Sequence, residues 1–117
     1  MRSLYIESDT ATGGHVVLRL KGRFSVEDSI ALRDILDQYI AEGRKAIFMD
    51  CTELSQINSA AIGVLVGAKM KMNRYAGMVL LFGLNNLIQE VMKLTGVDLI
   101  LPSYQNLEEA IQSFEKG

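Results

Sequence analysis

Two neighbouring stretches decide how this chain folds: Lys45-Ala-Ile-Phe-Met-Asp50-Cys51 and Asn58-Ser59-Ala60-Ala61-Ile62-Gly63. The first contains four consecutive apolar residues, as expected of a strand covered on both faces, and Asp50 is expected to mark its solvent end. In the second, the apolar period becomes that of a helix, so Ser59 should lie in or just before a first helical turn. Free N–H groups and the helix dipole favour hydroxyls and anions there.

Strands and helices alternate along the rest of the chain. The segments 4–8 and 15–21 are expected to pair as an antiparallel hairpin, because Ala11-Thr-Gly-Gly14 between them is a turn sequence. Helices long enough for crossovers then imply parallel strands. The sequence therefore predicts an α/β fold in one domain, 1–117: a mixed, mostly parallel sheet of four to five strands and about four helices, in the order β-β-α-β-α-β-α-β-α. The later elements are expected at 26–42 (helix), 59–75 (helix), 78–82 (strand), 86–96 (helix), 99–101 (strand) and from 106 onward (helix).

Composition narrows the class of protein. With 117 residues, 49% of them hydrophobic, the chain is long enough for one well-filled core. The net charge is -2 and the 12 basic residues are scattered, which does not predict a nucleic-acid partner. The longest apolar run, 60–68, is too short to span a bilayer, and the N-terminus lacks a signal-peptide core. The lone Cys51 is compatible with a reducing compartment, so we expect a cytoplasmic protein without a membrane partner.

The stretch from Asp50 to Leu65 resembles the signature of STAS domains, in particular bacterial anti-sigma factor antagonists. In that family a strand ending in Asp is followed by a pattern like Asp-Ser-Ser-Gly-Leu-Gly. The opening hairpin, Gly22-Arg-Phe-Ser25 ahead of the first helix and the Leu-Phe-Gly-Leu exit at 81–84 extend the resemblance over the whole chain. Two positions depart from the pattern: Asn58 stands where Asp is common, and Ala61 stands where Gly is common.

The resemblance implies a non-enzymatic switch protein without a cofactor. Such antagonists bind an anti-sigma factor that is also a serine kinase, and they lose that binding when the kinase phosphorylates the serine matching Ser59. A metal-dependent serine/threonine phosphatase resets them. With Asn58 in place of a carboxylate, a phosphate on Ser59 would meet less local repulsion.

Helical geometry separates two sides of the predicted 59–75 helix. The side expected to face the core carries Ala61, Val64, Leu65, Ala68, Met72 and Tyr75. The opposite side is expected to form a smooth apolar strip, since small residues admit a partner backbone and Met adapts to irregular surfaces. The predicted partner-binding residues are Asn58, Ser59, Ala60, Gly63, Val66 and Met70.

Each singled-out residue also has a structural interpretation. Ser59 is a good helix N-cap, and Gly63-x-x-x-Gly67 is typical of close helix packing. Asp50 resembles the phosphate-accepting aspartate of a receiver domain, but no acidic pair follows the first strand, so we interpret it as structuring the following turn. Cys51 is interpreted as a structural thiol, because the only histidine lies in the opening hairpin. No zinc-type cluster, phosphate-binding glycine loop or paired carboxylates predict a metal site, catalytic residues or an enzyme.

Other functions remain open at this level. A scaffold or transporter-associated STAS protein would use the same surface without phosphorylation. A small-ligand sensor would use a pocket between the strand ends and the Ser59 turn. The sequence is compatible with a monomer or with a weak dimer formed through the edge strand.

Overall fold

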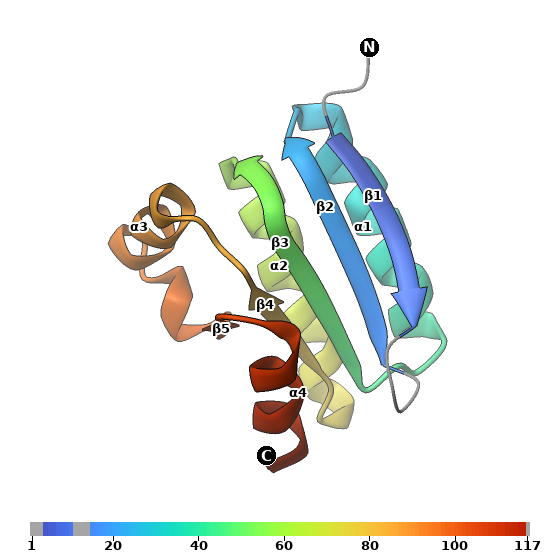
Figure 1. Ribbon diagram of the computed structural model, residues 1–117. Helices are drawn as coiled ribbons and strands as arrows, with labels where there is room; N and C mark the ends of the chain where they lie inside the picture. Colours follow the sequence, from blue (N-terminus) through green and yellow to red (C-terminus); the bar gives the residue numbers. More distant parts are fainter. Residues whose placement is uncertain (1–3, 11–14, 117) are drawn as a thin grey trace.

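A five-stranded mixed sheet organises the molecule, whose computed structural model describes residues 4–10 and 15–116 (Figure 1). β1 pairs antiparallel with β2, and the remaining neighbours pair in parallel in the order β1-β2-β3-β4-β5. This confirms the predicted hairpin and mixed sheet, while the turn expected at 11–14 lies outside the described residues. The strands are β1 (Leu4–Thr10), β2 (Val16–Arg23), β3 (Ala46–Gln56), β4 (Met78–Phe82) and β5 (Ser103–Tyr104).

Helices cover the two faces of the sheet unequally (Figure 1). α1 (Val26–Ala41) and α2 (Ser59–Met72) pack on one face, and α3 (Asn86–Leu94) adds Ile88 and Met92 to the same core. α4 (Leu107–Lys116) covers part of the other face around Phe48. The predicted α/β class is confirmed, and the core is continuous beneath the three helices on the larger face.

The central strands show why the sequence folds this way. The apolar residues at 46–49 and 79–81 are buried, as a strand covered by helices on both faces requires. The predicted start of α1 is also present: Ser25 is the N-cap and forms a reciprocal capping box with Asp28. Local sequence and burial therefore agree in the half of the chain that leads to Ser59.

The last strand is not where the sequence predicted it. The expected strand 99–101 forms instead the end of a 3-10 turn, η3 (Val97–Leu99), and the residues that follow it. Gly96, with φ +75°, starts this turn, and the Leu101 N–H donates to the Val97 carbonyl, so these groups do not join the sheet. Pairing begins after Pro102, whose carbonyl accepts from Leu81 N–H; a proline without an N–H is tolerated at an edge strand.

Two helix ends also differ from expectation. Asn85, not Asn86, caps α3, since its side chain accepts from Ile88 N–H at 2.8 Å. α2 ends at Met72 and continues as a 3-10 turn, η2 (Asn73–Tyr75), rather than as regular helix. Neither shift moves the buried side of α2, because Ala61, Leu65, Ala68 and Met72 are buried as predicted. Val64 and Tyr75, expected on the same side, are half-buried and pack against this core.

Candidate functional site

Ser59 opens α2 where the chain leaves the carboxyl end of β3. Its side chain is exposed, and its hydroxyl forms no hydrogen bond with any described residue. The prediction that Ser59 lies in or just before a first helical turn is confirmed. A serine hydroxyl that is both solvent-accessible and unbonded is available to an incoming enzyme.

Asn58 explains why the Ser59 hydroxyl is not needed to cap α2. Asn58 is the N-cap of α2: its Oδ1 accepts from Ala61 N–H at 2.8 Å, and its Nδ2 donates to the Phe24 carbonyl at 3.4 Å. The interpretation of Ser59 as the helix cap is wrong, because the preceding residue performs that role. The same amide ties the start of α2 to the segment between β2 and α1, which holds the Ser59 turn in place.

Asp50 is a buried carboxylate within β3 rather than at its end. β3 continues to Gln56, although its pairing with β4 stops at Asp50. The Asp50 Oδ1 accepts from the Thr52 hydroxyl at 2.6 Å and from Thr52 N–H at 3.0 Å, and Oδ2 accepts from Arg19 Nε at 3.1 Å. The expected bonding two residues along the chain is present, but it supports a strand extension and not a turn.

The ionisation of Asp50 follows from these contacts. Burial disfavours the charged carboxylate, but the hydrogen bonds from Thr52 and from Arg19 outweigh it and hold the pKa of Asp50 below its ordinary value. The pKa of the neighbouring Cys51 shifts in the opposite direction, since burial and then the Asp50 charge raise the pKa of its thiol to about 12. Cys51 is thus a buried neutral thiol, which agrees with its structural interpretation.

A groove runs between α1 and α2 beside Ser59. The volume of this groove is about 280 Å³. A Cβ placed on Gly63 or Gly67 would have no atom within 4 Å, so the prediction of close packing at these glycines is wrong. The groove is lined by Arg33, Leu36, Asp37, Ala60, Gly63, Val64, Gly67, Ala68 and Lys71.

The predicted strip on α2 is only partly exposed. Met70 is 64% exposed, as expected of an outward residue. Val66 instead is half-buried and packs against the main core. The exposed part of the predicted partner surface therefore consists of Ser59, Ala60, Gly63 and Met70, with Asn58 and Val66 half-buried.

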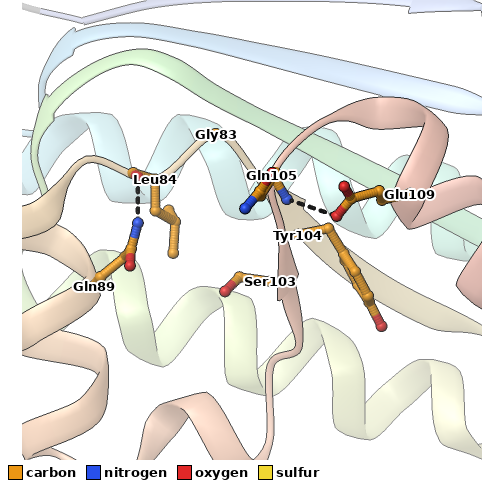
Figure 2. A pocket seen from close by; sticks show the side chains of 7 residues that line it. All are labelled: Gly83, Leu84, Gln89, Ser103, Tyr104, Gln105 and Glu109. Carbon is orange, nitrogen blue, oxygen red and sulfur yellow. Dashed lines mark hydrogen bonds between the residues drawn. The ribbon is translucent and has the colours of Figure 1, made fainter.

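A separate polar cavity of about 390 Å³ lies at the carboxyl ends of β4 and β5 (Figure 2). Its Gln89 Nε2 donates to the Leu84 carbonyl at 2.8 Å, and Gln105 N–H donates to Glu109 Oε1 at 3.4 Å. The ligand-sensor alternative placed a pocket beside the Ser59 turn, whereas this cavity is bounded by the starts of α3 and α4. Sequence reasoning missed it, because its lining residues are spread from Gly83 to Glu109 without a motif.

The described residues contain no group of three His, Cys, Asp or Glu side chains placed to hold a metal ion. Among the described residues, no helix combines the length and apolar character needed to cross a bilayer.

Comparisons with known proteins agree on the family and the fold. A family model described as STAS domain matches residues 8–110. The anti-sigma-B factor antagonist of Listeria monocytogenes is 23% identical over 99 residues, which cover 85% of this chain and 87% of that protein. The crystal structure of an anti-sigma factor antagonist from Mycobacterium paratuberculosis has a TM-score of 0.85 at 18% identity, covering 97% of this chain and 95% of that one. The phosphorylated form of the Bacillus cell fate determinant SpoIIAA has a TM-score of 0.73 at 22% identity, covering 93% and 98%.

Proposed function

Because this chain belongs to the STAS domain family, and with it to regulatory proteins rather than enzymes, we propose that it acts as a cytoplasmic anti-sigma factor antagonist switched by phosphorylation. In its unmodified form it binds an anti-sigma factor of the serine-kinase type through the surface around Ser59. Transfer of a phosphoryl group to Ser59 releases that partner, and a serine/threonine phosphatase restores binding.

This proposal rests on one observation: Asn58 caps α2, and the Ser59 hydroxyl is exposed and has no hydrogen bond among the described residues. Asn58 supplies the helix cap, so phosphorylation of Ser59 breaks no hydrogen bond among the described residues. The added charge also lies at the start of α2, where the helix dipole favours an anion. Modification is therefore expected to leave the fold intact while changing the surface.

The energetic effect on a partner is large enough for a switch. A phosphate brings about -1.5 to -2 charges near neutral pH. Each unit facing a partner carboxylate at roughly 5 Å costs about 3 kcal/mol at an effective dielectric near 20. Burying the dianion against Gly63 and Ala60 adds a desolvation cost. After screening by salt, we expect affinity to fall about tenfold to several hundredfold.

A small-ligand sensor is the second candidate, favoured by the polar cavity in Figure 2. Its lining includes Gln89, Ser103 and Glu109 but no lysine or arginine, so it suits a polar ligand without a phosphate group. A ligand bound there would raise the melting temperature without any change at Ser59. A scaffold that uses the Ser59 surface without phosphorylation is distinguished from the switch by the experiment below.

The decisive experiment compares binding and phosphorylation in one set of variants. Purified serine-kinase anti-sigma factors from the same genome are titrated by calorimetry with wild type, Ser59→Ala and Ser59→Asp. Each anti-sigma factor is also incubated with the wild-type protein and ATP, and the product is analysed by mass spectrometry. Ser59→Ala should bind like wild type, Ser59→Asp should bind at least about tenfold more weakly, and one phosphate should appear on Ser59.

The matched control is Ser8→Asp, which adds the same charge at an exposed position of the edge strand β1. It should bind like wild type. Equal binding by Ser59→Asp and wild type, together with an unmodified Ser59, would instead favour a scaffold that is not switched.

A further inference from the structure

α3 exposes more apolar surface than its role in the core explains. Ile88 and Met92 are buried, yet Leu87 and Leu94 on the same helix are 61% and 77% exposed. Residues 87, 91 and 94 lie on one side of a helix, so the exposed leucines and the half-buried Val91 form a continuous stripe. Exposed apolar surface of this kind on a soluble domain marks an interaction site.

A small socket joins this stripe to the Ser59 turn. Its volume is about 160 Å³, and it is lined by Gln56, Ile57, Leu87, Ile88 and Val91. Ile57 immediately precedes the helix cap Asn58, so the socket begins two residues from Ser59 along the chain. An apolar cavity of about 150 Å³ accommodates a benzene-sized group, and the socket therefore has room for one large apolar side chain.

The socket is held rigidly in place. Asn85 Nδ2 donates to the Leu54 carbonyl at 3.2 Å and to the Ser55 carbonyl at 3.3 Å, which fixes the start of α3 against the end of β3. Figure 1 shows α3 beside that end of the strand. Four of the five lining residues are apolar and Gln56 is polar. A preformed pocket of this kind is typical of the anchor positions that dominate protein interfaces.

The charge at the rim indicates what kind of partner fits. Arg23 Nε donates to Gln56 Oε1 at 3.2 Å, and Arg23 forms no ion pair with the described residues. None of the five lining residues carries a carboxylate. A partner with a carboxylate beside its apolar side chain would complement Arg23 at the rim.

We propose that this socket is the anchor of the Ser59 interface, and that it receives one large apolar side chain of the anti-sigma factor next to an acidic residue that pairs with Arg23. The inference rests on the proposed function, since it assigns the occupant by continuity with the Ser59 turn. It adds that a phosphate on Ser59 acts close to an acidic segment of the partner, which makes the repulsion specific.

Calorimetric titration of the same anti-sigma factors against Leu87→Asp tests the proposal, with Leu99→Asp as the matched control. Both leucines are well exposed, at 61% and 88%, so both variants should fold, but only Leu87 lines the socket. Leu87→Asp should weaken binding at least tenfold, while Leu99→Asp should change it less than about twofold. Arg23→Glu should weaken binding several-fold, with a smaller loss at high salt.

The outcomes separate this inference from the proposed function. Wild-type binding by Leu87→Asp, with weak binding by Ser59→Asp, overturns the socket and leaves the switch in place. Unchanged binding by Arg23→Glu overturns the acidic anchor. A wild-type dimer in sedimentation that Leu87→Asp dissociates assigns the socket to a second copy and overturns the proposed occupant. Failure of wild type to bind any anti-sigma factor overturns both proposals.

Discussion

Two serines at helix starts have opposite surroundings in this protein. Ser25 is the N-cap of α1, and its hydroxyl lies 2.8 Å from Asp28 Oδ2 and accepts from Asp28 N–H at 3.3 Å. Ser59 is the first residue of α2, and its hydroxyl has no hydrogen bond within the described part of the chain. The Ser25 hydroxyl stabilises its helix through the capping box, whereas the Ser59 hydroxyl is exposed to solvent.

The residue before each serine accounts for the difference. Asn58 satisfies the first-turn N–H of Ala61, so the helix does not need the Ser59 side chain. Phe24 has no side-chain acceptor, so Ser25 must cap α1 itself. Residue type and approximate position in a helix therefore do not decide whether a serine caps that helix. What decides it is whether the preceding residue already accepts a hydrogen bond from the first turn.

Introducing a carboxylate at each serine should give the largest difference between the two sites. Ser25→Asp places an anion against Asp28, and we expect the free energy of unfolding to fall by about 2 kcal/mol. Ser59→Asp meets the start of a helix without an acidic residue in its first turn, and the change should stay within about 0.5 kcal/mol. Urea unfolding measures both values. Equal losses would show that Ser59 supports the fold as much as Ser25 does.

Lowering the pH should destabilise the part of β3 after Asp50, which leads to the Ser59 turn. The folded pKa of Asp50 is lowered, so its stabilisation is present above its ordinary pKa of about 3.9 and is lost as pH falls through the lowered value. Asp50→Asn should therefore cost about 1 to 2 kcal/mol at pH 7 and progressively less at acid pH. Urea unfolding of wild type and variant at several pH values tests this. A pH-independent cost would assign the loss to packing rather than to the carboxylate.

Most of the fold was predictable because its central strands are continuous apolar runs. The stretches at 46–49 and 78–82 predict buried parallel strands, and Ser25 with Asp28 predicts the start of α1. The last strand was missed because Leu99 and Leu101 are apolar but belong to a turn that Gly96 begins. A two-residue edge strand after a proline carries too little sequence signal to be predicted.

The candidate site was predictable in position but not in detail. Asn58 and Ser59 are both good N-caps, and sequence alone leaves the helix start uncertain by one residue. The openness at Gly63 depends on how far α1 lies from α2, which is a tertiary property. The socket formed by Ile57 and Leu87 joins residues thirty positions apart, so no local pattern indicates it.

The smallest expected effect concerns Asn58, on which the contrast between the two serines depends. Asn58→Ala removes the cap of α2 and should lower the free energy of unfolding by about 1 kcal/mol, whereas Asn58→Asp keeps an acceptor and should stay within about 0.5 kcal/mol. Hydrogen exchange at the Ala61 amide should quicken in Asn58→Ala alone, because that N–H loses its partner. If Asn58→Ala were neutral and the Ala61 amide stayed protected, Ser59 would have taken over the cap. The Ser59 hydroxyl would then be engaged in capping its helix, as that of Ser25 is.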